Sequence, residues 1–148
     1  MAGRAQLAEP ECRATLDALH ERPGAGADGA VGFWGINMGT WGFNMGTVTG
    51  VPLVAIEPRI KAAVFGRLRP DALAERAKRI TIPIESDMRW DDEHISREEG
   101  LALFDAFASK EKSLHVNSGQ HKELPRFGAD SAVRFFTRCL GSEVTSPA

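Results

Sequence analysis

Two tandem copies of a seven-residue motif supply the first residues that could do chemistry. Residues 34–40 read Trp-Gly-Ile-Asn-Met-Gly-Thr and residues 41–47 read Trp-Gly-Phe-Asn-Met-Gly-Thr, so six of seven positions match. Each copy contains Gly-x-Asn-x-Gly, centred on Asn37 or Asn44. The glycines permit a tight turn, and asparagine is one of the few other residues that tolerate positive φ. The repeat therefore predicts a sharp turn that presents an asparagine side chain.

The apolar run at residues 30–34, directly before the first copy, predicts a buried strand. A strand that enters such a turn is the setting of the nucleophile elbow Gly-x-Ser-x-Gly, here with asparagine in place of serine. A neutral carboxamide has no readily abstracted proton and is a poor nucleophile. The strand favours Asn37 as the central residue, whereas the spacing to Val51-Pro52 favours Asn44. We expect Asn37, because a strand must feed the elbow; the plainer alternative is a lengthened glycine-rich loop.

Acidic residues and a histidine follow in two polar loops. Asp91, Asp92 and Glu93 stand together, and His121 follows Gly119-Gln120. Taken alone, these loops are typical of solvated charge and an exposed histidine. The histidine spacings match no standard zinc pattern. No metal or cofactor is therefore expected.

Helical and strand patterns alternate along the chain and must position these loops. We expect strands at residues 30–34, 60–65, 83–88 and 113–116. Helices are expected over residues 7–20, between the first two strands, from Pro70, from the Ser96–Glu99 capping box, and before Gly141, with Pro10 in a first turn and with Val133, Phe136 and Leu140 facing inward. Such alternation predicts an α/β fold: one domain over residues 1–148, with a parallel sheet of about four strands and helices on both faces.

Four stretches of the sequence, in this order, resemble the α/β-hydrolase superfamily, and within it the dienelactone-hydrolase-like esterases. They are Val31–Thr40 around the elbow, Glu57–Gly66, Trp90–Glu93 and Gly119–Lys122. The resemblance covers about Ala30 to Leu140 and corresponds to the carboxyl-terminal half of the family's fold. It implies a partial α/β-hydrolase fold.

The resemblance also implies roles for individual residues. The family's acid maps to Asp92, with Asp91 as the alternative, and its histidine maps to His121. In the family the histidine deprotonates the nucleophile and the acid orients the histidine. The backbone N–H of Met38 or Met45, after the nucleophile position, would point into the oxyanion hole.

Two functions follow from these assignments. The first is hydrolysis of small carboxylic esters or lactones, impaired because asparagine replaces the elbow serine. The second is a non-catalytic domain that binds a small ligand or a partner. Asparagine favours the second for this chain, and the family favours the first for its ancestry.

Composition limits the remaining partners. The chain has 148 residues, 43% of them hydrophobic, and a net charge of −2. Nucleic acid is therefore not an expected partner, and no apolar run approaches the roughly 20 residues of a membrane span. With two cysteines and no signal peptide, a cytoplasmic protein is expected.

The family's strands ahead of the elbow strand have no counterpart, so residues 30–34 should form an open edge through which two copies dimerise.

Overall fold

A single parallel sheet organises the structure, a computed structural model that describes residues 2–22, 30–36, 45–66, 73–121, 123 and 125–141. Its elements, in chain order, are α1 (Ala2–His20), β1 (Val31–Trp34), α2 (Met45–Val54), β2 (Ile60–Gly66), α3 (Ala74–Ala77), β3 (Ile84–Arg89), α4 (Arg97–Ala106), β4 (Lys112–Asn117) and α5 (Arg126–Leu140). The expected alternation of strands and helices is confirmed.

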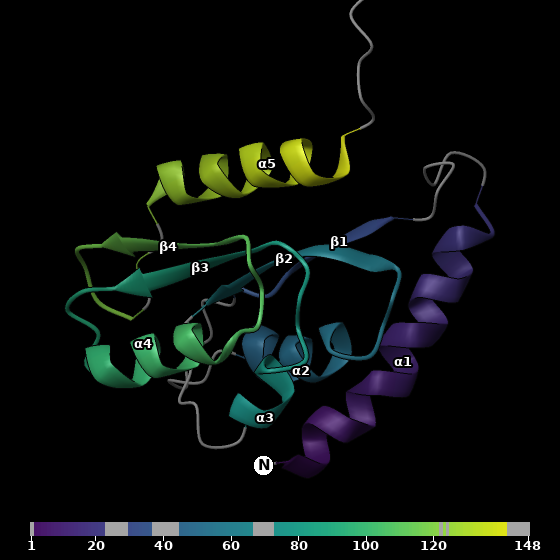
Figure 1. Cartoon of the computed structure of the whole chain (residues 1–148), viewed down its shortest axis with the longest axis horizontal. Helices are drawn as coiled ribbons and strands as arrows, with labels where there is room; N and C mark the ends of the chain where they lie inside the picture. Colours follow the sequence, from purple (N-terminus) through teal and green to yellow (C-terminus); the bar gives the residue numbers. More distant parts are fainter. Residues whose placement is uncertain are drawn as a thin grey trace, which may run out of the picture.

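The strands lie in the order β1-β2-β3-β4, and each is parallel to its neighbour. Helix α5 covers one face of the sheet, whereas α2, α3 and α4 lie on the other (Figure 1). This is the expected α/β architecture. Among the described residues, β1 pairs only with β2 and β4 only with β3, so these two strands are the edges.

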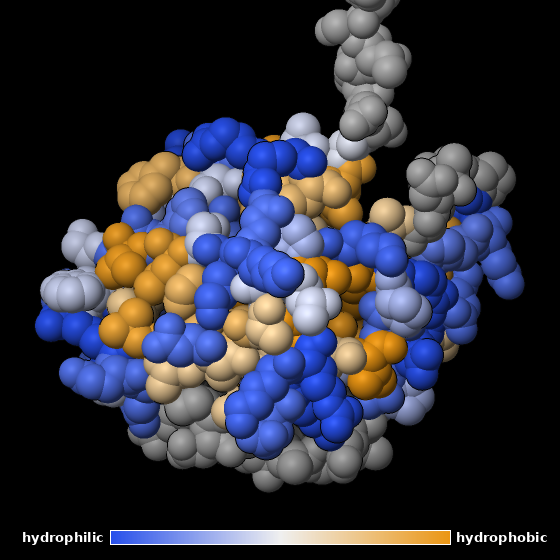
Figure 2. Space-filling view, in the orientation of Figure 1, coloured by the Kyte–Doolittle hydropathy of each residue, from blue (hydrophilic) through white to orange (hydrophobic). Residues whose placement is uncertain are grey.

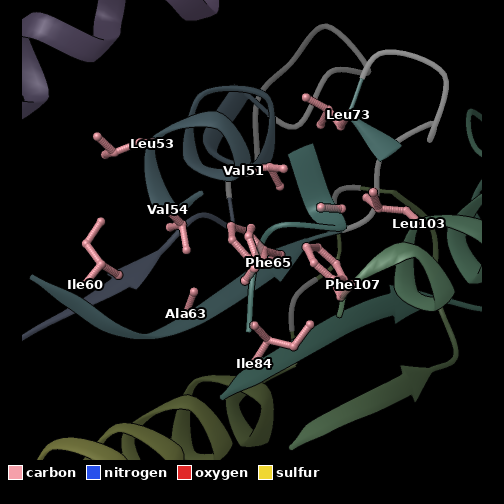
Figure 3. Packing of buried hydrophobic residues seen from close by; sticks show 12 residues of the cluster. Val51, Leu53, Val54, Ile60, Ala63, Phe65, Leu73, Ile84, Leu103 and Phe107 are labelled. Carbon is pink, nitrogen blue, oxygen red and sulfur yellow. The ribbon is translucent and has the colours of Figure 1, made fainter. Parts of the chain in front are cut away.

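Alternating side chains of β2 divide the core into two clusters. Ala63 and Phe65 contribute to the cluster beneath α2–α4, and Ala62 and Val64 contribute to the cluster beneath α5. The ring of Phe65 stacks on Phe107, with centroids 5.3 Å apart and planes 4° from parallel (Figure 3). Because β2 is buried on both faces beyond the exposed Lys61, its sequence from Ala62 to Phe65 is a continuous apolar run rather than an alternating one.

The expectation that Val133 faces the sheet is wrong, because its side chain is 59% exposed. Phe136 and Leu140 do pack against the cluster beneath α5, and Ala132 and Phe135 are buried there. Val133 follows Ala132 by one residue, which places it about 100° further around the helix and off the buried face.

The expectation that Pro10 lies in a first helical turn is also wrong. Helix α1 begins at Ala2, so Pro10 lies in its interior and cannot donate its backbone hydrogen bond. The helix continues beyond Pro10, where Cys12 packs against the core and Leu16 is buried. Packing after the proline offsets the lost bond.

Apolar side chains also reach the surface. Figure 2 shows hydrophobic surface over the part of the molecule where α4 and β4 lie, and the exposed large side chains of these elements are Leu101 and Val116. Trp34, at the end of β1, is 45% exposed. None of the helices in the described ranges is both long enough and apolar enough to cross a bilayer.

Candidate active site

The loops that follow β3 and β4 bring Asp92 and His121 together. These strands are parallel neighbours, so their carboxyl ends meet at one edge of the sheet. His121 Nδ1 lies 2.7 Å from Asp92 Oδ2, and the two side chains are only 6% and 2% exposed. The structure thus pairs two residues that are 29 positions apart in sequence.

Backbone amides fix the orientation of the Asp92 carboxylate. Its Oδ1 atom accepts hydrogen bonds from the N–H groups of His94, at 2.8 Å, and Ile95, at 3.0 Å. Its other oxygen, Oδ2, contacts the imidazole. Each oxygen therefore has its own partners, and the carboxylate cannot rotate without breaking these bonds.

Asp91, the alternative acid, has a different contact. Its Oδ2 atom accepts a hydrogen bond from the backbone N–H of Gly119, at 3.3 Å, and its own N–H donates to the Gly119 carbonyl at 3.2 Å. Gly119 has φ of +119°, a conformation that favours glycine. Asp91 thus holds the backbone of the histidine loop, whereas Asp92 holds the imidazole.

Glu93 is a further contact between the two loops. Its Oε2 atom accepts a hydrogen bond from the His121 backbone N–H at 3.1 Å, and its Oε1 atom lies 3.4 Å from His94 Nε2. The bond from the His121 amide is the main cause that lowers the pKa of Glu93. The His94 ring stands edge-on to the His121 ring, with centroids 5.2 Å apart. In the sequence, Glu93 is typical of a solvated acidic loop, and only its position beside the candidate acid sets it apart.

A buried ion pair on β3 makes hydrogen bonds to both ends of the loop that carries His121. Arg89 and Asp87, both on β3 and nearly buried, form an ion pair. Asn117 Nδ2 donates to Asp87 Oδ1 at 3.2 Å, and Arg89 Nε donates to the carbonyl of Glu123. The loop is therefore held on both sides of His121. In the sequence, Asp87 and Arg89 stand out as charged residues in an otherwise strand-like stretch, but the sequence does not show which residues they contact.

The nucleophile side of the candidate site is described only at its two ends. Asn37, Asn44 and Met38 lie outside the described residues. Met45 is the first described residue of α2, and its expected role in an oxyanion hole stays a prediction.

The structure offers no metal site among the residues it describes. No group of three or more histidine, cysteine, aspartate or glutamate side chains there is arranged to hold an ion. The arrangement that remains is an oriented histidine with a buried acid, which is suited to moving a proton.

Neither the family models nor the curated proteins gave a match to this chain. Solved structures did. A zinc-bound structure of a cold-adapted esterase from an Arctic intertidal metagenomic library matches with a TM-score of 0.76 and 31% identity, over 88% of this chain and 56% of that one. A complex of such an esterase with PEG matches with a TM-score of 0.74 and 30% identity, over 86% and 53% of the two chains.

A monoacylglycerol lipase from Paleococcus ferrophilus shares the fold at 14% identity, with a TM-score of 0.59, over 88% of this chain and 72% of that one. The likeness to the esterases supports the assignment to the α/β-hydrolase superfamily that the sequence motifs implied. The chain spans about half the length of the esterases that it matches, and over most of its own length it has their α/β fold.

Proposed function

We propose that this chain is an α/β-hydrolase domain of the carboxylic ester or lactone class, with His121 as its base and Asp92 as the acid that orients it. The observation that carries the proposal is the buried pair of His121 Nδ1 and Asp92 Oδ2, 2.7 Å apart. With Nδ1 engaged by the carboxylate, Nε2 is the nitrogen that would take a proton from a nucleophile and return it to a leaving group.

Asparagine at the nucleophile position limits this chemistry. Acyl transfer needs an oxygen or sulfur nucleophile whose proton the histidine can remove, and a carboxamide supplies neither. We therefore propose that esterase activity is impaired, with Asn37 at the nucleophile position and Asn44 as the alternative. The dienelactone-hydrolase-like group and small esters or lactones as substrates belong to the same proposal.

A serine-directed fluorophosphonate probe and a p-nitrophenyl acetate burst assay test this proposal. We expect the natural chain to show neither labelling nor a burst, because it has no elbow serine. Asn37→Ser should gain labelling and a slow burst, and the added substitution His121→Ala should abolish both. Labelling of the natural chain would show that its activity is not impaired. Labelling of Asn44→Ser alone would move the nucleophile position to the second copy.

A non-catalytic binding domain is the second candidate, and the asparagine itself favours it. A pocket that has lost its nucleophile can still bind a small ester without cleaving it. Titration of the natural chain with a short-chain ester, followed by NMR, separates the two candidates. Shifts near His121 with the ester intact would support binding alone, and conversion to acid and alcohol would support catalysis.

A further inference from the structure

Asp92 and Glu93 hold two histidines in a reciprocal arrangement. Each carboxylate contacts the ring of one histidine and accepts a hydrogen bond from the backbone N–H of the other. Asp92 lies 2.7 Å from the His121 ring and accepts from the His94 N–H at 2.8 Å. Glu93 lies 3.4 Å from the His94 ring and accepts from the His121 N–H at 3.1 Å. The four residues thus form a closed cycle of contacts that places the two imidazoles side by side.

The two rings lie close together but differ in their access to water. The His121 side chain is 6% exposed, whereas the His94 side chain is 46% exposed. The rings stand edge-on, with centroids 5.2 Å apart and planes 82° from parallel. Two positive charges at this separation repel each other, and water screens them only in part because one ring is buried. A proton on His94 therefore opposes a proton on His121.

The Glu93 carboxylate interacts with both imidazoles. The hydrogen bond from the His121 backbone N–H is the largest cause that lowers the pKa of Glu93, and the charged forms of both rings act in the same direction. Two other carboxylates on these loops, Asp91 and Glu123, each accept a hydrogen bond from a backbone N–H. Of the described carboxylates on the two loops, Asp92 and Glu93 are the ones that contact the rings.

We propose that His94 is a positioning residue for His121: it takes up the first proton as the pH falls, and thereby keeps His121 neutral and able to accept a proton at lower pH. Water reaches the His94 ring and Glu93 lies beside it, so a positive charge costs less there than on the buried ring. The two imidazoles then titrate as a coupled pair. The inference rests on the proposed function only for the role of His121 as the base.

NMR titration of the histidine rings tests the coupling without any need for activity. The chain has four histidines, so each ring signal can be assigned by substitution. We expect His94→Phe and His94→Gln both to raise the pH at which His121 is half protonated, by about half a unit or more. Phenylalanine keeps an aromatic ring beside His121 and glutamine keeps a donor near Glu93, so a shift shared by both variants follows from the lost charge.

His115→Gln is the matched control for these variants. This histidine on β4 is also partly exposed, but its ring contacts Glu85 and Ser131. The substitution should leave the His121 midpoint unchanged, and an equal rise there would assign the effect to net charge and overturn the proposal. An unchanged or lower midpoint in the His94 variants would also overturn it. A rise in only one of them would do the same, because it would assign the effect to the shape or hydrogen bonding of the side chain.

The pH profile of fluorophosphonate labelling links the coupling to the proposed function. In Asn37→Ser, labelling should fall as His121 becomes protonated, and added His94→Phe should move this fall to higher pH by the same amount as the NMR midpoint. A shifted NMR midpoint with no labelling, or with labelling that falls at an unchanged pH, would contradict the proposed function and leave the coupling intact. An unshifted NMR midpoint with labelling retained would overturn the coupling and leave His121 as the base.

Discussion

Asp91 and Asp92 are chemically identical neighbours, yet their carboxylates have different partners. Asp92 contacts the imidazole of His121, and Asp91 contacts the backbone N–H of Gly119. The order of motifs predicted this pair of loops, and the family resemblance favoured Asp92 over Asp91 as the acid. No sequence pattern showed which carboxylate would point toward the imidazole, because that depends on how the loop after β3 turns.

Asp92→Asn is the substitution that tests this difference. The amide nitrogen in the new side chain would donate to His121 Nδ1 and reverse the ring's tautomer. We expect loss of the downfield Nδ1–H proton signal of His121 in the NMR spectrum, with the fold retained. Asp91→Asn is the matched control and should keep the signal; an unchanged signal in Asp92→Asn would contradict the pairing.

Glu93→Ala tests whether that side chain positions the histidine loop. Removal of the carboxylate leaves the His121 backbone N–H without the acceptor that it has at 3.1 Å. We expect its amide hydrogen to exchange several times faster, while Glu93→Gln, which keeps an acceptor oxygen, restores slow exchange. Glu98→Ala, on the exposed first turn of α4, is the control and should have no effect on this amide. Equal exchange in Glu93→Ala and the natural chain would rule out this positioning role.

Individual helices and strands were more predictable from the sequence than the side-chain contacts between them. The capping box at the start of α4 was expected from Ser96 and Glu99, and both of its hydrogen bonds are present. A capping box is local, so the sequence alone determines it. Arg89, which pairs with Asp87 on the same strand, also donates to the Glu123 carbonyl beyond β4, and such a contact between distant residues has no local signature.

A second cluster of charged residues joins helix α1 to the residues directly before β2, which are also far apart in the sequence. The Glu57 carboxylate is nearly buried and accepts hydrogen bonds from Arg59 and Arg13, while Arg59 also reaches Asp17 on α1. Its side-chain hydrogen bond with Arg59 is the largest cause that lowers the pKa of Glu57, to about 2. The cluster therefore favours the ionised carboxylate in the folded chain.

Acid should remove the stability that this cluster supplies. The folded-state pKa of Glu57 lies below its ordinary value of 4.5, so the contribution is complete above about pH 4.5 and is lost as the pH falls toward 2. The shift corresponds to about 3 kcal/mol at neutral pH. Glu57→Gln should lower the free energy of unfolding at pH 7 and flatten its decline below pH 4.5.

Urea unfolding across this pH range provides the measurement for Glu57→Gln. Glu75→Gln, which removes an exposed carboxylate paired with Lys78, is the control and should leave the profile close to that of the natural chain. Parallel profiles for Glu57→Gln and the natural chain below pH 4.5 would show that the buried carboxylate is not the source of the acid sensitivity.

The whole sheet follows from simple rules of connection. Strands joined by helical crossovers are parallel, and consecutive strands tend to be neighbours, so the order β1-β2-β3-β4 is the simplest outcome. The same order brings the carboxyl ends of β3 and β4 side by side, and with them Asp92 and His121. The placement of individual side chains on α5 was less predictable, as Val133 shows, because a helix can rotate by one residue at little cost to its pattern.

The outer edge of β1 leads to the last prediction, which concerns assembly. Of the described strands, only β2 pairs with β1, so the backbone N–H and C=O groups on its other side have no partner strand among the described residues. Trp34, 45% exposed, stands at the end of this edge. We propose that two copies meet here about a two-fold axis, which would join their sheets into one of eight strands.

Light scattering at high micromolar concentration should therefore show a dimer. Trp34→Lys places a charge at the edge and should shift the population toward monomer, because the charge would have to be desolvated in the interface. Val133→Lys is the matched control, since this exposed apolar side chain lies on α5 and not on the edge strand. A natural chain that is strictly monomeric, or equal dissociation by both lysine variants, would show that β1 is not the surface through which two copies associate.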